Sequence, residues 1–167
     1  YRTNHDSINS YAEALLKTIG SEVQQQGSSK AGLQSIKEFC TAKGVEFAEA
    51  RLLDGSGLSP LNLITAAQLL EVLIIMTRET PFPVFLQSLP LAGHSGTLKR
   101  HFHGSSAEGV LRAKSGFLSN TIAYAGYTPM ENGHLAAFVI IVNDYHGPSA
   151  NMRQKILDMM SAIRSHQ

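Results

Sequence analysis

Three short strand-like segments follow one another in the C-terminal third of the sequence, with short joints between them that contain turn residues. Residues 110–114, 122–127 and 135–143 have lengths typical of strands, and the last two contain β-branched and aromatic residues. The Asn132-Gly133 step before the last segment favours a tight hairpin. Strands joined this closely pair with their neighbours, so the sequence predicts an antiparallel meander.

Apolar residues at helical spacing precede and follow this meander. They predict helices over residues 7–19, 30–43, 65–76 and 149–165, with a short helix or turn over residues 84–89. Asp6 or Ser7 is expected to cap the first helix, Gly20 to end it, and Thr65 to cap the third. The last helix is expected to turn Met152, Met159 and Met160 towards the core. This order of elements predicts an α+β fold in which helices flank an antiparallel sheet.

The composition is that of an ordinary globular protein and carries few functional signals. The 167 residues have a formal net charge of +1, which gives no indication of binding to nucleic acid or to an anionic membrane. No apolar run reaches the roughly 18 residues of a membrane-spanning helix. Cys40 is the single cysteine, so an intrachain disulfide is excluded and a buried thiol is expected. His94, His101 and His103 are close in sequence, but no carboxylate or cysteine completes a recognisable ligand set with them, so no metal site is expected.

The triplet Lys114-Ser115-Gly116 is expected at the end of the first strand. A lysine on a strand edge supplies a positive charge for a substrate carboxylate, and the neighbouring hydroxyl donates a hydrogen bond to the same group. Gly116 lets a substrate backbone approach the strand closely. Taken alone, the triplet is more simply interpreted as a strand end that runs into a turn.

A loop dense in turn-forming residues is the second candidate element. It reads Asp54-Gly-Ser-Gly-Leu-Ser59-Pro-Leu-Asn62. One interpretation is a polar loop that caps the helix after it. The other is a functional loop in which the Ser59 hydroxyl relays a proton and the Asn62 amide orients a substrate.

Taken together and in this order, the two elements resemble the penicillin-binding proteins and serine β-lactamases, whose motifs are Ser-X-X-Lys, Ser-X-Asn and Lys-Thr/Ser-Gly. Within these proteins the chain resembles the class C low-molecular-mass group, the D-Ala-D-Ala carboxypeptidase/endopeptidases. Four segments are similar to segments of that family in the same order: residues 9–20, 54–59, 89–93 with 96–98, and 113–116 followed by 125–127. The resemblance implies that the antiparallel sheet and its helices are part of a β-lactamase/transpeptidase-like fold.

The sequence departs from the family pattern at the nucleophile. No serine in the 167 residues is followed three residues later by lysine, so the Ser-X-X-Lys motif is absent. In the family this motif lies early in the chain, before a large insertion. We therefore expect residues 1–167 to be the C-terminal portion of the DD-peptidase domain, inactive by itself. The alternative is a non-catalytic peptidoglycan-binding or scaffold domain. Two smaller departures are Ser115, where threonine is usual, and the two residues that separate Ser59 from Asn62.

The resemblance also implies a role for each candidate residue. A peptidoglycan stem peptide would be cleaved through an acyl-serine intermediate, with the nucleophile outside this chain. Ser59 would pass a proton to the leaving amine, and Lys114 would hold both Ser59 and the incoming carboxylate by its charge. Ser115 would bond to that carboxylate, Asn62 would orient the substrate, and the backbone N–H of Phe117 would donate to the oxyanion hole.

The same resemblance implies the partners and the compartment. The expected partners are a stem peptide, β-lactam antibiotics as acylating mimics, and either the missing N-terminal segment or a second chain. No metal or other cofactor is needed for this chemistry, and no nucleic acid is expected to bind. The compartment would be the periplasm or another extracytoplasmic space of a bacterium.

Overall fold

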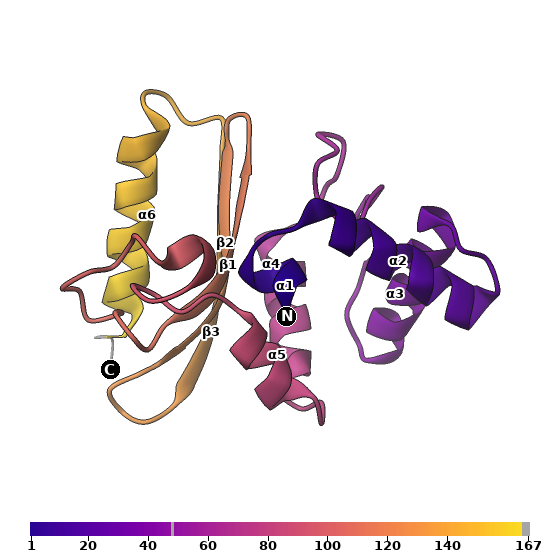
Figure 1. Cartoon of the computed structure of the whole chain (residues 1–167), viewed down its shortest axis with the longest axis horizontal. Coiled ribbons are helices and arrows are strands. Elements are labelled where there is room, and N and C mark those ends of the chain that lie inside the picture. The colour runs from indigo at the N-terminus through magenta and orange to yellow at the C-terminus, as the bar shows by residue number, and fades with distance from the viewer. Residues whose placement is uncertain (48, 165–167) are drawn as a thin grey trace.

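A three-stranded sheet lies between the C-terminal helix on one side and the other α-helices on the opposite side (Figure 1). The computed structural model describes residues 1–47 and 49–164. The elements in chain order are α1 (Arg2–His5), α2 (Asn9–Gln24), α3 (Ser29–Ala42), α4 (Ala66–Met76), α5 (Phe82–Ser88), the 3₁₀ turn η1 (Gly96–Leu98), β1 (Arg112–Leu118), β2 (Thr121–Pro129), β3 (Leu135–Asn143) and α6 (Ser149–Ile163). The predicted α+β class is confirmed. Within the described ranges, no helix has both the length and the apolar character needed to span a membrane.

The sheet is an antiparallel meander in the order β1-β2-β3, as predicted. β3 has the predicted bounds, whereas β1 continues to Leu118, beyond its predicted end at Lys114. The strand continues because Gly116 pairs with Ala123, and the chain turns only at Ser119, whose φ is +46°. The lysine triplet therefore lies in the middle of a strand and not at its end.

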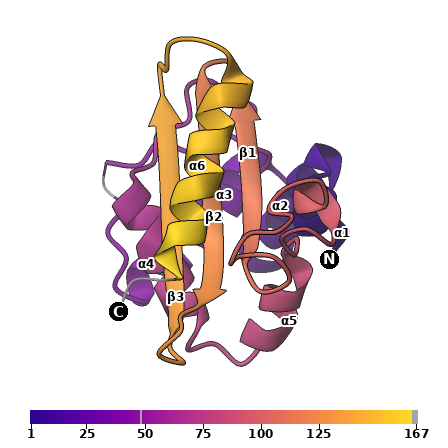
Figure 2. The same ribbon diagram turned by 90° about the vertical axis from the view of Figure 1, so that its left-hand side faces the viewer.

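Helix α6 covers one face of the sheet (Figure 2). Its Ile156 and Met160 are 1% and 0% exposed, and they pack with Ile122 and Tyr124 of β2. Each such side chain stabilises the fold by roughly 1.5–3 kcal/mol when it leaves water. The prediction for Met159 is wrong: this residue is 57% exposed, because one apolar stripe accommodates only one of two consecutive methionines. Residue 165 of the predicted helix lies outside the described residues.

Helices α4 and α5 cover the opposite face. Tyr127 of β2 is buried there, edge-on to the rings of Phe82 and Phe85. Its hydroxyl donates to the Leu73 carbonyl at 2.7 Å, which ties the sheet to α4. Burial raises the pKa of Tyr127, so the phenol keeps the proton that this bond requires.

Helices α2 and α3 form a pair that lies on the far side of α1 and α4 from the sheet (Figure 1). Two glycines allow their close approach, since a Cβ at Gly20 would lie 2.7 Å from the backbone nitrogen of Gly32. Gly20 thus serves this contact and is not the predicted end of the helix, since α2 continues to Gln24. The predicted cap is also wrong: Ile8 occupies the N-cap position, and neither Asp6 nor Ser7 caps the helix.

Side-chain caps fix the starts of the next two helices. The Thr65 hydroxyl accepts from the Gln68 N–H at 3.1 Å, and the Gln68 side chain accepts from the Thr65 N–H, which confirms the predicted cap of α4. The Ser28 hydroxyl accepts from the Ala31 N–H before α3. Cys40, near the end of α3, is buried as predicted, and burial raises the pKa of its thiol.

Candidate active site

The outer edge of β1 is covered only at its start. Residues 89–92 run beside it there, and the Ala113 N–H donates to the Pro90 carbonyl at 3.1 Å. Backbone groups alternate between the two edges of a strand, so the N–H groups of Ser115 and Phe117 point to the same outer edge. In the described part of the chain, no backbone group of another segment bonds to them on that edge. The edge is therefore open to an added extended peptide.

The side chain of Lys114 leaves β1 on the face opposite α6. Its Nζ donates to the Ser7 hydroxyl at 2.7 Å and to the Ser115 carbonyl at 2.5 Å. Lys114 is half-buried, and this desolvation lowers its pKa below the ordinary value. Among residues 1–47 and 49–164, no carboxylate forms a salt bridge with it. A half-buried ammonium group without a counter-ion is suited to bind an anion, such as a substrate carboxylate.

Ser7 is held against β1 by the short segment between α1 and α2. Its φ of +56° is rare for a residue other than glycine, and such geometry concentrates at functional sites. α1 is anchored to α5 because the Asn4 amide donates to the Ser88 hydroxyl at 2.8 Å. The His5 carbonyl lies against Gly96, where a Cβ would come within 2.4 Å of its oxygen. These contacts fix α1 against α5 and Gly96, and α1 in turn positions Ser7, two residues after its end.

Ser7 is not among the predicted site residues, although the sequence contains the signal for it. Ser7-Ile8-Asn9 is a literal Ser-X-Asn triplet, the motif that the family resemblance requires. A serine before an amphipathic segment also fits a helix cap, and that interpretation hides the motif. The contact itself joins residues 107 positions apart, so no local pattern predicts it.

The rest of the lysine triplet faces a third segment and open space. The Ser115 hydroxyl lies 2.8 Å from the hydroxyl of Thr97 in η1. Gly116 is exposed, and a Cβ added there would meet only Ala123, at 3.7 Å from its side chain. Packing therefore does not require glycine at this position, which leaves close approach of a ligand as its use. The ring of Phe117 is 57% exposed and lies 5.8 Å from the guanidinium of Arg153.

The other predicted residues, Ser59 and Asn62, lie in a loop organised around Asp54. The Asp54 carboxylate accepts from the backbone N–H groups of Gly57 and Ser59 and from the Asn62 amide, all between 2.7 and 3.0 Å. The Ser59 hydroxyl accepts from the Leu61 N–H at 3.3 Å. No hydrogen bond found in the described residues joins this loop to the lysine triplet. The roles assigned to Ser59 and Asn62 stay predictions.

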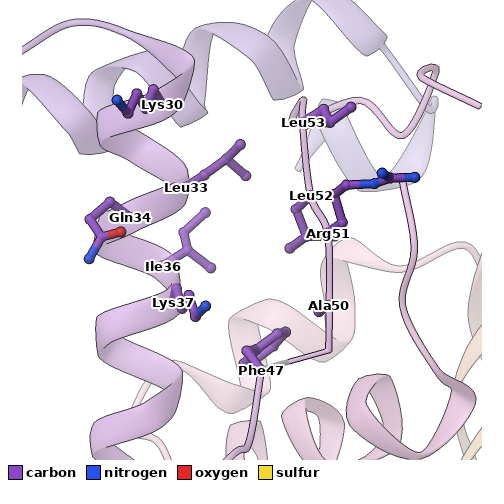
Figure 3. A pocket seen from close by; sticks show the side chains of 10 residues that line it. All are labelled: Lys30, Leu33, Gln34, Ile36, Lys37, Phe47, Ala50, Arg51, Leu52 and Leu53. Carbon is purple, nitrogen blue, oxygen red and sulfur yellow. The ribbon is translucent and has the colours of Figure 1, made fainter. Parts of the chain in front are cut away.

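A cavity of about 390 Å³ lies elsewhere, between α3 and the segment after it. Leu33 and Ile36 of α3 point across it towards the opposite segment, which carries Phe47 and Leu52 (Figure 3). None of the residues around Lys114 lines it. We place the candidate site at the strand edge, because the cavity brings together no nucleophile, acid or base with a partner.

The fold is found in solved structures of penicillin-binding proteins. The chain superposes on penicillin binding protein 4 (dacB) of Haemophilus influenzae, solved in complex with a β-lactam, with a TM-score of 0.90. The match covers 99% of this chain and 40% of that chain, at 23% sequence identity. The architecture is therefore that of a penicillin-binding protein, as the resemblance implies.

Sequence comparison identifies the family. The model of the D-Ala-D-Ala carboxypeptidase 3 (S13) family matches residues 2–165, so the chain belongs to this family. It is 40% identical over 148 residues to a D-alanyl-D-alanine carboxypeptidase of Actinomadura sp. (strain R39). It is 30% identical over 165 residues to carboxypeptidase DacB of Mycolicibacterium smegmatis. These matches cover 86% and 95% of the chain but 27% and 35% of the relatives, so the chain spans about a third of their length.

Proposed function

We propose that the protein is a serine D-Ala-D-Ala carboxypeptidase/endopeptidase that acts on peptidoglycan stem peptides, and that residues 1–167 supply the substrate-binding half of its active site. The bond between Lys114 of Lys-Ser-Gly and Ser7 of Ser-X-Asn carries this proposal. Two motifs that are distant in sequence converge there, beside an open strand edge. The names of the relatives, D-alanyl-D-alanine carboxypeptidase and carboxypeptidase DacB, support the same reaction.

The substrate binds as an extended strand along the open edge of β1. Backbone hydrogen bonds to Ser115 and Phe117 hold it, and Gly116 leaves room for its backbone. Its terminal carboxylate receives the positive charge of Lys114 and a bond from the Ser115 hydroxyl. The N–H of Phe117 points to the same edge, so it donates to the oxygen of the scissile carbonyl as that oxygen becomes negative.

The reaction proceeds in two steps through a covalent ester. A serine of a Ser-X-X-Lys motif outside residues 1–167 attacks the carbonyl carbon, and the lysine of that motif takes its proton. The C–N bond then breaks, and the leaving amine takes up a proton. Water attacks the ester in the second step and releases the serine. A β-lactam enters the same first step, because its ring amide opens on the serine and the acyl group stays attached.

Ser7 passes the proton to the leaving amine in this scheme, in place of Ser59. Because Lys114 donates to the Ser7 oxygen, the hydroxyl proton of Ser7 is free to point towards a leaving nitrogen. The positive charge of Lys114 also stabilises negative charge on that oxygen while the proton is in transit. Asn9, exposed at the start of α2, takes the substrate-orienting role assigned to Asn62.

Two assays with the full-length protein test the proposal. A fluorescent penicillin is expected to label it covalently, and a stem pentapeptide is expected to release D-alanine. The chain of residues 1–167 alone is expected to remain unlabelled, because it contains no Ser-X-X-Lys. A full-length protein that neither becomes labelled nor releases D-alanine would overturn the proposal.

One observation favours a second candidate function, a non-catalytic peptidoglycan-binding or scaffold domain. The sequence of 167 residues keeps two of the three family motifs and lacks the nucleophile. This alternative predicts peptidoglycan binding without acylation, even in the full-length protein. The same labelling assay separates the two. For both functions we place the protein in the periplasm or an equivalent extracytoplasmic space, because peptidoglycan lies there.

A further inference from the structure

We propose that Thr97 is a positioning residue for the hydroxyl of Ser115. The inference rests on the proposed function, in which that hydroxyl binds the substrate carboxylate, and it adds a residue that lies in neither motif. The two hydroxyl oxygens are 2.8 Å apart and both residues are half-buried. Within the described residues, neither side chain has another hydrogen-bond partner. Thr97 and Ser115 therefore form an isolated hydroxyl pair next to Lys114.

The turn that carries Thr97 is fixed on several sides. Leu98 is fully buried in the core beneath α6, and its carbonyl accepts from the Gly93 N–H at 3.2 Å. Gly96 has a φ of +53° and lies against the His5 carbonyl, where a side chain would collide with the backbone. The backbone on both sides of Thr97 is therefore held in place, and this positions the Thr97 side chain beside β1.

Thr97 contacts β1 at Ser115, on the outer edge of the strand. Residues 89–92 cover that edge as far as Ala113, and Ser115 is the next residue whose backbone points outwards. Thr97 contacts the side chain of this residue, where the covered edge ends and the open edge begins. The hydroxyl of Ser115 is consequently shared between Thr97 and any ligand on the open edge.

Binding of a carboxylate changes what this shared hydroxyl must do. A hydroxyl donates one hydrogen bond and accepts up to two. In the free protein the Ser115 hydroxyl donates to Thr97. When a carboxylate binds, Ser115 donates to the carboxylate, and Thr97 reverses its own hydroxyl to donate to the Ser115 oxygen. The three groups then form a chain polarised in one direction, which strengthens each bond. This reversal needs a hydroxyl at position 97 and makes no use of the methyl group.

The test compares Thr97→Val with Thr97→Ser in the full-length protein. The substrates are a stem peptide with a free C-terminal carboxylate and the same peptide with a C-terminal amide. Thr97→Val is expected to lower kcat/KM for the carboxylate substrate about tenfold, mainly through KM, because one hydrogen bond to a charged complex is lost. The amide substrate offers only a neutral acceptor, so its loss is expected to be clearly smaller. Thr97→Ser is expected to match the wild type.

A double substitution separates this role from a general structural one. In a Ser115→Ala background, Thr97→Val is expected to have no additional effect, because Thr97 acts through the Ser115 hydroxyl. Thr97→Ala, which adds no bulk, repeats the test if valine disturbs folding. Equal losses for both substrates, failure of Thr97→Ser to restore activity, or a full effect in the Ser115→Ala background would overturn the role of Thr97. A wild-type protein that cleaves neither substrate would instead overturn the proposed function.

Discussion

The amino group of Lys114 lies 2.7 Å from the hydroxyl of Ser7, across 107 positions of sequence. Both residues are held in unfavourable states: Ser7 has a φ of +56°, and Lys114 is half-buried with no carboxylate partner in the described residues. Strained backbone and desolvated charge destabilise a fold, and they concentrate where function requires them. We therefore propose that the pair is part of an active site and not a stabilising contact.

The charge of Lys114 predicts a pH dependence of substrate binding. Burial lowers the pKa of Lys114 from its ordinary value of 10.5, because desolvation disfavours the ammonium form. As pH rises, Lys114 of the free protein loses its charge at a lower pH than an exposed lysine does. We expect KM for a carboxylate-terminated substrate to rise by about one order of magnitude or more on this alkaline limb, with a midpoint below pH 10.5.

The matched control for this pH profile is the amide-terminated substrate, whose KM is expected to stay flat. The free energy of unfolding should increase with pH while substrate binding weakens. Between the lowered pKa of folded Lys114 and 10.5, the unfolded chain binds more protons at Lys114 than the folded protein does. The contribution of Lys114 to the free energy of unfolding therefore increases with pH in this window. A KM that rises equally for both substrates would assign the alkaline limb to another group.

The contact between α2 and α3 predicts that Gly20→Ala destabilises the protein. The new Cβ would lie 2.7 Å from the backbone nitrogen of Gly32, and neither helix backbone can yield easily. We expect the free energy of unfolding in urea to fall by about 1–3 kcal/mol, as for other overpacked interfaces. Gly27→Ala is the control, because a Cβ there meets nothing within 4 Å, and its effect should stay within about 0.5 kcal/mol. Equal effects of the two substitutions would contradict the close approach of the helices.

The outer edge of β3 predicts self-association of residues 1–167 when they are produced alone. In the described residues β3 pairs with β2 on one side and with no strand on the other, and an unpaired edge of nine residues is a template for a second chain. Ala137→Pro should reduce association, because alternation turns the Ala137 N–H outwards and proline removes it. Ala136→Pro, which removes an N–H directed at β2, should unfold the sheet instead. Light scattering that shows a monomer for the unsubstituted chain would count against this prediction.

The parts of the fold that depend on local periodicity could be predicted from the sequence. β3 has its predicted bounds, and Thr65 caps α4 as expected, because an apolar run and a capping residue act within a few positions. Gly20 and Gly116 were assigned to element ends, where glycine is common. In the structure one serves a close helix contact and the other continues a strand, and only tertiary packing distinguishes these uses.

The candidate site could be predicted in part. The lysine triplet could be recognised because it consists of three neighbouring residues. It lies beside an open edge because β1 is the first strand of the meander and residues 89–92 cover only its start. Ser59 is predicted as a site residue from its turn-rich loop and the family resemblance, whereas Ser7 is predicted only as a helix cap. Thr97 carries no motif at all, since its link to Ser115 arises from a turn that packs against two other segments.

The rate of acylation by a fluorescent penicillin, measured in the full-length protein with single serine-to-alanine substitutions, tests the central claim most directly. We expect Ser7→Ala to slow acylation by about 10²–10³-fold, the loss typical of a removed proton relay. Ser59→Ala is expected to stay within a few-fold of the wild type, as is Ser10→Ala, an exposed serine three residues beyond Ser7. A large loss with Ser59→Ala together with an unchanged rate for Ser7→Ala would contradict the placement of the active site at the Ser7–Lys114 contact.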